Sequence, residues 1–144
     1  MRKTTQHYDV LVVGGGASGL MAAGVAAELG KSVVVLEKNA KVGQKLDISG
    51  GGRCNITNAE YDVHALLPHY GKSEQALYSP FSQFGVQDTF DFFEKRGLPL
   101  IVEARKRAFP KTQKAPDVTR ALVRYAREGK VEIHTDAAVH KILT

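Results

Sequence analysis

The chain has 144 residues, of which 43% are hydrophobic, 24% charged and 8% aromatic. This composition is typical of one ordinary globular domain, and it excludes collagen-like, fibrous and disordered chains. The formal net charge is +5, but residues 95–130 carry eleven Lys and Arg against three acids, so the rest of the chain sums to −3. Phe109 and Tyr125 are the only aromatic residues of this segment, too few for a platform that stacks bases, so a solvated surface is favoured over a face that binds nucleic acid or an anionic ligand.

The compartment is indicated by features that the sequence lacks. No apolar stretch approaches the ~20 residues of a membrane helix, and the apolar run near Met1 is too short for a secretion signal. The single cysteine, Cys54, cannot form an internal disulfide, and we expect it to be a small buried side chain rather than a reactive thiol. The histidines show no metal-ligand spacing, so no metal site is predicted. We expect a cytoplasmic protein with a small-molecule substrate, and neither nucleic acid nor membrane as a partner.

Residues 8–37 carry the pattern of a strand, a glycine turn, a helix and a second strand. Residues 8–13 form a short β-branched apolar run, which is typical of a buried parallel strand. A helix is predicted over 18–29, with many small residues for close packing and with Gly30 as a left-handed C-terminal cap. Residues 32–36 are the next predicted strand. The segment is therefore predicted to be a βαβ nucleotide-binding unit.

The glycine turn of this unit, residues 14–19, fits the pattern G-x-G-x-x-G. Gly14 allows a tight turn, Gly16 lets the backbone approach a pyrophosphate, and Gly19 lets the helix lie close to the strand. The start of the helix, at Ala17 and Ser18, offers N–H groups and a partial positive charge to a diphosphate. We expect all five residues to bind a dinucleotide.

An acid closes the second strand of the unit. Glu37 lies 18 residues past Gly19, where a carboxylate accepts hydrogen bonds from an adenosine ribose. It would repel a 2′-phosphate, so FAD or NAD is favoured, and the neighbouring Lys38 weakens this argument only slightly. We count both residues as candidates for cofactor binding; the alternative for Glu37 is a surface acid at a strand end.

A long loop over 38–60, with one helical turn predicted at 44–48, contains a second run of three glycines. Exposed backbone N–H groups there, flanked by polar side chains, are suited to binding anions and carbonyl groups. A bare dinucleotide fold does not need this loop. Its candidate binding residues are Lys45, Ser49, Gly50, Gly51, Gly52, Arg53, Asn55 and Thr57.

The segment 61–130 is predicted to be mostly helical. Aromatic residues cluster on short helices over 61–93, and Asp88 is the predicted N-cap of a helix through Arg96 that ends at Gly97. A hairpin is expected over 98–109. Pro116 fits the first turn of a helix that ends at Gly129, and the apolar face of this helix is Val118, Leu122, Tyr125 and Ala126. Strands are predicted within 131–144, at 131–135 and 138–143.

The two glycine runs together resemble a known family. Residues 9–19, combined with Lys45-Leu46 and with the run from Ser49 to Asn58, are similar to bacterial FAD flavoproteins of the BaiN type, also described as aminoacetone-oxidase-like or NAD(P)/FAD-dependent oxidoreductases. The resemblance implies an α/β, Rossmann-like FAD-binding domain of the glutathione-reductase type, with three layers. It also implies that FAD is the cofactor, with NAD(P)H as a possible electron donor. Family members are much longer, so this chain is expected to hold an incomplete, N-terminal part of the fold.

By that resemblance the second loop wraps the FAD, with its polar residues near the pyrophosphate, the ribityl chain or the flavin ring. Hydrogen-bond donors near flavin N1 and O2 stabilise the reduced ring and so tune the cofactor that carries out the hydride chemistry. We expect Arg53 to compensate charge there; the alternative is a salt bridge that holds the loop. The two glycine runs are thus predicted to bind opposite ends of one flavin dinucleotide.

The predicted function is an FAD-dependent oxidoreductase that transfers hydride to or from an unidentified small molecule, with no catalytic residue assigned. Three alternatives stay open. A nucleotide-binding module without turnover would hold the adenosine half alone. An NAD-linked dehydrogenase would explain Glu37 but leave residues 49–58 without a purpose. A tRNA-modifying flavoenzyme would give the basic segment a partner.

Overall fold

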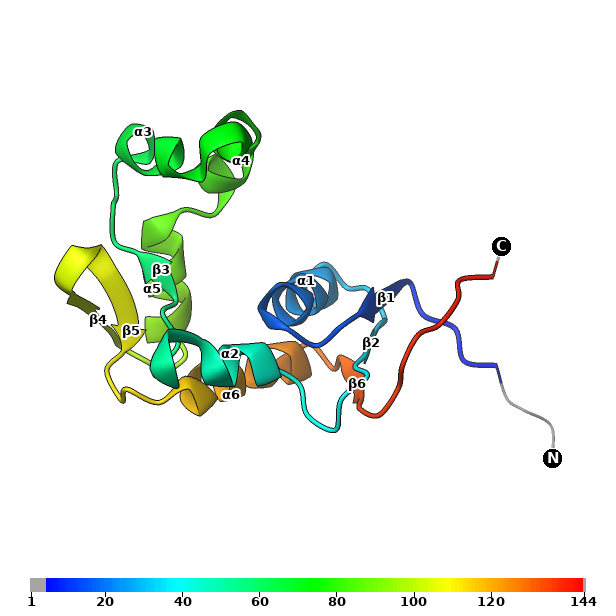
Figure 1. Ribbon diagram of the computed structural model, residues 1–144. Helices are drawn as coiled ribbons and strands as arrows, with labels where there is room; N and C mark the ends of the chain where they lie inside the picture. Colours follow the sequence, from blue (N-terminus) through cyan, green and yellow to red (C-terminus); the bar gives the residue numbers. More distant parts are fainter. Residues whose placement is uncertain (1–4, 144) are drawn as a thin grey trace. The chain divides into compact units, whose positions relative to one another are not determined.

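The computed structural model describes residues 5–143, which divide into two compact units (Figure 1). The first unit contains the chain up to Asp47 together with the residues from Thr119 onward. The second unit is Ile48–Val118.

A parallel sheet forms the centre of the first unit. Its strands are β1 (Val10–Val13), β2 (Val33–Leu36) and β6 (Glu132–His134), in the order β1-β2-β6. Val10 pairs with Val33, and Val34 pairs with Glu132. The β-branched residues suit this pleated and largely buried position, and Val35 is fully buried. The two predicted strands of the βαβ unit are confirmed.

Helix α1 (Ala17–Glu28) connects β1 to β2 and packs on both strands. It begins and ends one residue earlier than predicted. Gly30 has φ +76°, and its N–H donates to the Ala27 carbonyl at 2.9 Å, so the predicted left-handed cap is confirmed. Along β1, Leu11 and Val13 face away from α1 and are 55% and 58% exposed.

Helix α6 (Ala115–Glu128) has the predicted amphipathic face. Pro116 lies in its first turn, where the missing N–H costs nothing, and the chain leaves the helix at Gly129. The four residues of the predicted apolar face are all buried, at 4% exposure or less: Val118, Leu122, Tyr125 and Ala126. Tyr125 packs its ring directly against Gly24 of α1.

The second unit is built on an antiparallel sheet. Its strands are β3 (Thr57–Asn58), β4 (Leu100–Glu103) and β5 (Arg107–Pro110), in the order β3-β5-β4. The hairpin β4–β5 was predicted, whereas β3 was not. The turn η3 (Ala104–Lys106) joins the two long strands, and α5 (Val86–Glu94) packs on β3 and β4 through buried Phe side chains. Phe109 on β5, 1% exposed, is the largest fully buried side chain.

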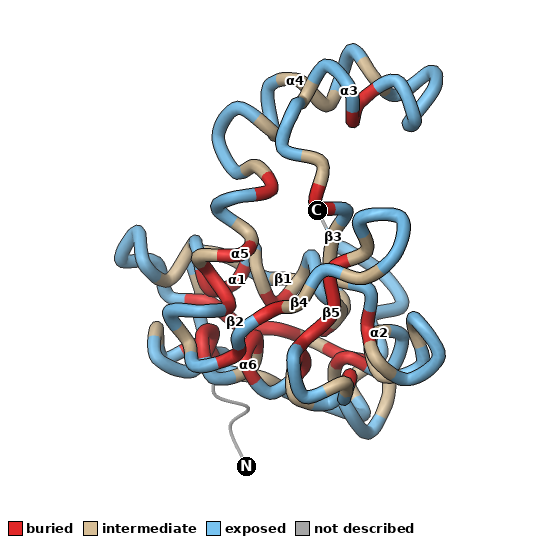
Figure 2. The backbone as a smooth tube through the Cα atoms, turned by 90° about the vertical axis from the view of Figure 1, so that its left-hand side faces the viewer, coloured by how far each residue is buried: buried red, intermediate tan, exposed pale blue. Residues whose placement is uncertain are grey.

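The remaining elements are short helices, and all lie in the second unit except the first of them, whose residues up to Asp47 belong to the first unit. α2 (Gln44–Ile48) and η1 (Ser49–Gly51) precede β3, and the helical turn predicted at 44–48 is confirmed. α3 (Val63–Leu66), η2 (Leu67–Ser73) and α4 (Glu74–Gln83) contact mainly each other. Leu66 and Leu67 are buried between them, but α4 has no buried residue, and Figure 2 shows this helical segment mostly in the exposed colour.

Two predictions about element boundaries are wrong. α5 begins at Val86, not after Asp88: the Asp88 carboxylate accepts the N–H of Gly85 at 2.8 Å and so stabilises a start three residues earlier. The structure also forms no strand over 138–143. Alternating apolar residues such as Val139 and Ile142 have the strand pattern, but a strand forms only where a neighbouring edge supplies its hydrogen bonds.

The contact between Gly24 and Tyr125 makes a prediction about stability. In a free helix, Gly→Ala is favourable by roughly 0.5–1 kcal/mol, but a Cβ at Gly24 would overlap the buried ring of Tyr125. We expect Gly24→Ala to lower the free energy of unfolding by about 1–3 kcal/mol, measured by urea denaturation. In a Tyr125→Leu background the same change should become neutral or stabilising. A gain in stability with Tyr125 present would contradict the packing described.

Candidate functional site

The glycine turn between β1 and α1 uses its glycines for different reasons. Gly14 has φ +101°, and its N–H donates to the Leu36 carbonyl at 2.8 Å, which closes the turn beside β2. A Cβ at Gly19 would overlap the Gly14 carbonyl, so only glycine lets the helix start this close to the strand. These two positions are fixed by the chain's own backbone.

Gly16 differs, because nothing in the chain requires it to be glycine. It is the N-cap of α1, its φ of −82° is open to any residue, and an added Cβ would meet no atom within 4 Å. The first N–H groups of α1, at Ala17 and Ser18, have no partner inside the helix. A backbone cradle that a Cβ would fill, at the positive end of a helix, fits a diphosphate.

Glu37 follows β2 and is only 7% exposed. Its Oε2 accepts the N–H of Gly15 at 2.7 Å, and its Oε1 accepts the backbone and side-chain N–H groups of Asn39 at 2.9 and 2.7 Å. The Asn39 backbone N–H is the main cause that holds the pKa of Glu37 below its ordinary value, against the opposing effect of burial. The buried group is therefore a carboxylate at neutral pH, locked in one orientation.

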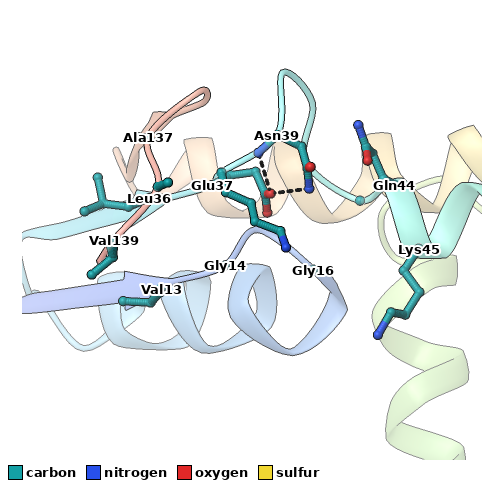
Figure 3. Close-up of a pocket in the computed structure, with 13 residues that line it drawn as sticks. Val13, Gly14, Gly16, Leu36, Glu37, Asn39, Gln44, Lys45, Ala137 and Val139 are labelled. Carbon is teal, nitrogen blue, oxygen red and sulfur yellow. Dashed lines mark hydrogen bonds between the residues drawn. The ribbon is translucent and has the colours of Figure 1, made fainter. Parts of the chain in front are cut away.

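Gly14, Gly16, Glu37 and Asn39 are among the residues that line a pocket of about 300 Å³ in the first unit. Figure 3 shows the two ends of this pocket. The apolar side chains of Val13, Leu36 and Val139 gather at one end, while Lys45 lies at the other. The Glu37 carboxylate lies between the two ends. The order along the pocket is thus apolar surface, carboxylate, then glycine turn and cation, which matches the order base, ribose and phosphate in a nucleotide.

Backbone hydrogen bonds place both walls of this pocket. The N–H of Gly43 donates to the Gly15 carbonyl at 2.8 Å, which brings the following residues Gln44 and Lys45 to the glycine turn. On the other side, the N–H of Ala137 donates to the Glu37 carbonyl at 2.8 Å, and this places Val139 at the pocket.

The sequence analysis did not identify several lining residues. Asn39 and Gln44 carry no motif, and 137–139 lie within a region predicted to contain a strand. Their positions depend on hydrogen bonds between segments far apart in the chain, such as that from the N–H of Asp136 to the Asn39 carbonyl at 3.0 Å. Short sequence patterns cannot report such pairings.

The second glycine run lies in the other unit. Gly50, Gly51 and Gly52 all have positive φ, at +57°, +67° and +81°, and all three are exposed. The Ser49 carbonyl accepts the N–H groups of Gly52 and Cys54, both at 3.0 Å, which curls the backbone. An added Cβ would meet no atom within 4 Å at Gly51, so this is a second open backbone surface.

Polar side chains next to the second run of glycines have hydrogen-bond partners within the second unit. Arg53 donates to both carboxylate oxygens of Glu103 at 3.0 Å, so the salt bridge considered as the alternative for Arg53 is present. The Asn55 amide nitrogen, in the orientation that satisfies it, lies 3.1 Å from the Thr57 carbonyl oxygen and 3.2 Å from that of Ala108. Cys54 is 2% exposed, which agrees with the predicted packing role.

The predicted site residues therefore fall into two groups. The pocket of the first unit is lined by Gly14, Gly16, Glu37, Lys38 and Lys45, with Ala17, Ser18 and Gly19 following at the start of α1. The second group is in the other unit, with Thr57 on β3, and consists of Ser49, Gly50, Gly51, Gly52, Arg53, Asn55 and Thr57. That both groups bind one cofactor stays a prediction.

Residues 5–143 lack two structural features. No helix there is both long and apolar enough to cross a membrane. No group of three or more His, Cys, Asp or Glu in the same residues is arranged to hold a metal ion.

A parallel sheet, a glycine turn at a helix start and a buried carboxylate after the second strand define a dinucleotide-binding Rossmann domain. Comparison with known families gives the same class. Residues 8–144 match the family described as HI0933-like protein Rossmann domain, and the chain belongs to it. Members of this family are FAD-dependent oxidoreductases, so the Rossmann-like FAD-binding fold class is confirmed and the chain holds part of that domain.

Curated relatives differ in what they act on. A 3-dehydro-bile acid delta(4,6)-reductase from Clostridium scindens is 32% identical over 133 residues, which cover 91% of this chain and 32% of that protein. A ribosomal RNA dihydrouridine synthase from Haemophilus influenzae is 44% identical over 78 residues, 52% of this chain and 20% of that protein. The chain thus spans less than a third of the length of these relatives.

A solved structure shares the fold. The 3-ketosteroid-delta4-(5alpha)-dehydrogenase from Rhodococcus jostii RHA1 superposes with a TM-score of 0.67 at 18% identity, over 93% of this chain and 39% of that one. At this identity the likeness shows the fold alone.

The contrast between Gly16 and Gly19 gives a prediction with a matched control. Gly16→Val should lower the free energy of unfolding by only about 1 kcal/mol, because the side chain enters open space and only the N-cap preference for Gly over Val is lost, but should weaken ADP binding at least about tenfold. Gly19→Ala should instead destabilise the fold, because its Cβ overlaps backbone. Calorimetric titration with ADP and urea denaturation measure the two effects. Unchanged ADP affinity in Gly16→Val would rule out a phosphate at this turn.

The lowered pKa of Glu37 predicts a pH-dependent stability. A carboxyl group whose pKa is lowered in the folded state stabilises the protein at pH values above its unfolded-state pKa, near 4.5. This stabilisation is lost as the pH falls through the folded-state pKa. Glu37→Gln turns an amide N–H toward buried donors, so we expect a loss of about 1–3 kcal/mol at neutral pH.

The difference in free energy of unfolding between Glu37→Gln and the wild type should become smaller at acidic pH, because the wild type loses the contribution of the carboxylate there. Urea denaturation at neutral pH and near pH 3.5 measures it. Glu94→Gln, at an exposed position on α5, is the control. An equal difference at both pH values would refute the role assigned to the carboxylate.

Proposed function

We propose that this chain is the cofactor-binding part of an FAD-dependent oxidoreductase. The observation that carries the proposal is the pocket of the first unit, where an apolar end, a locked carboxylate and an open glycine turn follow one another. The membership in the HI0933-like family supports FAD over NAD as the occupant. Readings as an NAD-linked dehydrogenase or as a module without turnover are not favoured.

The adenosine half of FAD is held by the first unit. Val13, Leu36 and Val139 provide an apolar surface for adenine. Glu37 Oε2 has a lone pair left after its bond to Gly15, whereas Oε1 already accepts two bonds from Asn39, so Oε2 accepts a ribose hydroxyl. The backbone at Gly16 and the start of α1 donate to the pyrophosphate, and the cations of Lys38 and Lys45 balance its charge.

The rest of FAD is held by the loop over 49–57. The exposed backbone of Gly50 and Gly51, in left-handed geometry, faces carbonyl or phosphate oxygens of the cofactor, and Ser49 and Thr57 add hydroxyl groups. The N–H of Gly52 already donates to the Ser49 carbonyl and shapes the loop. When bound, FAD supplies the hydride chemistry. The chain's own residues bind the cofactor and fix its position.

The substrate is a small molecule with a carbon–carbon double bond next to a carbonyl group. Support comes from the names of relatives: a 3-dehydro-bile acid delta(4,6)-reductase and 3-oxosteroid 1-dehydrogenases. NAD(P)H is the proposed electron donor for the reductive direction. The narrower assignment to the BaiN type and the cytoplasmic location rest on the sequence alone.

An RNA uracil ring is the second candidate substrate, because it has the same chemical feature. It is favoured by the ribosomal RNA dihydrouridine synthases of Haemophilus influenzae and Escherichia coli, 44% and 32% identical over the aligned parts. The exposed cations of α6, Arg120, Arg124 and Arg127, would suit a polyanion. This candidate would reverse our expectation that no nucleic acid is bound.

FAD binding tests the proposal directly. Added FAD should be retained by the purified protein and give visible flavin absorption bands. Gly51→Ala places a methyl group where the cofactor's flavin half is proposed to lie, so we expect FAD affinity to fall at least about tenfold with ADP affinity unchanged.

Gly97→Ala is the matched control, because Gly97 is also exposed in the second unit, has positive φ, at +74°, and has open space around an added Cβ. Both replacements carry the same left-handed strain of roughly 1–2 kcal/mol. Equal losses of FAD affinity in the two variants, or a protein that takes up no FAD, would defeat the proposal.

A further inference from the structure

We propose that Arg53 is a positioning residue: with Glu103, Gln113 and Phe109 it holds the glycine loop over 49–52 in the shape that receives the flavin half. This inference rests on the proposed function. It chooses between the two roles considered for Arg53, and it adds three residues that the sequence analysis did not connect with the site.

Three of the four side chains, from three places in the second unit, form a closed set of hydrogen bonds. Arg53 Nη1 donates to Glu103 Oε1 and Oε2, both at 3.0 Å, and to Gln113 Oε1 at 2.9 Å. Gln113 Nε2 in turn donates to Glu103 Oε1 at 3.1 Å. Glu103 ends β4, and Gln113 follows β5. The end of the glycine loop is therefore tied to two segments at least 50 residues away.

Phe109 forms the floor of this cluster. The guanidinium carbon of Arg53 lies 4.1 Å from the centroid of its ring, a cation–π contact. The same buried ring would lie 3.1 Å from a Cβ at Gly50. Arg53 and the first glycine thus rest on one rigid surface, and the loop between them spans a fixed distance.

The loop needs such support because its backbone is strained. Three successive glycines and then Cys54, at φ +61°, adopt left-handed geometry, which for Cys54 costs roughly 1–2 kcal/mol. Only one backbone bond reaches Gly52 from the segment that follows Gln113: the N–H of Ala115 donates to its carbonyl at 2.9 Å. Charge-assisted bonds from Arg53 to a half-buried carboxylate supply the stronger attachment.

The two roles of Arg53 predict opposite effects of changes at Glu103. If Arg53 directly compensates charge on the flavin, Glu103→Gln removes a competing anion and should strengthen FAD binding or leave it unchanged. If Arg53 positions the loop, Glu103→Gln releases the attachment and should weaken FAD binding, as Arg53→Met does. Lysine also separates the roles: Arg53→Lys keeps the charge but loses the planar guanidinium that stacks on the Phe109 ring, so only the positioning role predicts a loss.

The first measurement needs no cofactor. Hydrogen exchange of the apo protein should be roughly fivefold faster at the amides of Gly52, Cys54 and Ala115 in Arg53→Met and in Glu103→Gln than in wild type. Glu94→Gln, on exposed α5 surface, should match wild type. Unchanged exchange in both cluster variants would overturn the proposal.

The second measurement compares FAD with ADP by calorimetric titration. Both single variants should lose FAD affinity about tenfold, and the double variant no more than either one, because the residues act through one attachment. ADP affinity should stay unchanged, which a general loss of folding would not allow. FAD affinity that is raised or unchanged in Glu103→Gln would overturn the positioning role. If wild type binds no FAD, the proposed function fails, and the exchange experiment still decides whether the cluster holds the loop.

Discussion

The buried carboxylate of Glu37 is the group on which the pocket depends. It joins the glycine turn, through the N–H of Gly15, to the segment after β2, through Asn39. The backbone of the same residue holds the segment that carries Val139, through the N–H of Ala137. Three pieces of chain therefore meet at one residue, and a charge that would be costly to bury alone is stabilised by three donors. Because these bonds are already formed, binding a ribose requires little rearrangement.

Some glycines of this chain are explained by packing within the fold, whereas others have open space around an added Cβ. Gly19 is fixed by its contact with backbone, and Gly24 by the ring of Tyr125, so both are explained by packing alone. Gly16 and Gly51 have open space where a Cβ would be, and neither is required by a neighbour in the chain. Gly51 is still favoured by its own φ of +67°, but Gly16 has a φ open to any residue, so its glycine indicates that something outside the chain approaches the backbone.

Local patterns predicted the parts of this protein whose geometry is local. The turn at Gly14, the cap at Gly30 and the apolar face of α6 follow from residue types at fixed spacings, and the structure has them. Asn39 and the pairing of Arg53 with Glu103 had no such signal, because they depend on residues brought together only by the fold. The strand expected over 138–143 was wrong for the same reason, since a sequence shows the pattern of a strand but not the edge that would pair with it.

The positive charge of Arg53, next to the glycine loop over 49–52, is balanced within the chain by Glu103. This balance constrains how the loop can act on a cofactor. Glu103 neutralises Arg53 at close range, so the surface offered by residues 49–52 is made of backbone dipoles rather than a full positive charge. Backbone N–H groups recognise carbonyl and phosphate oxygens by direction, and their strength depends on being held still. A fixed loop with a neutralised arginine therefore favours precise placement of a flavin over strong attraction of any anion.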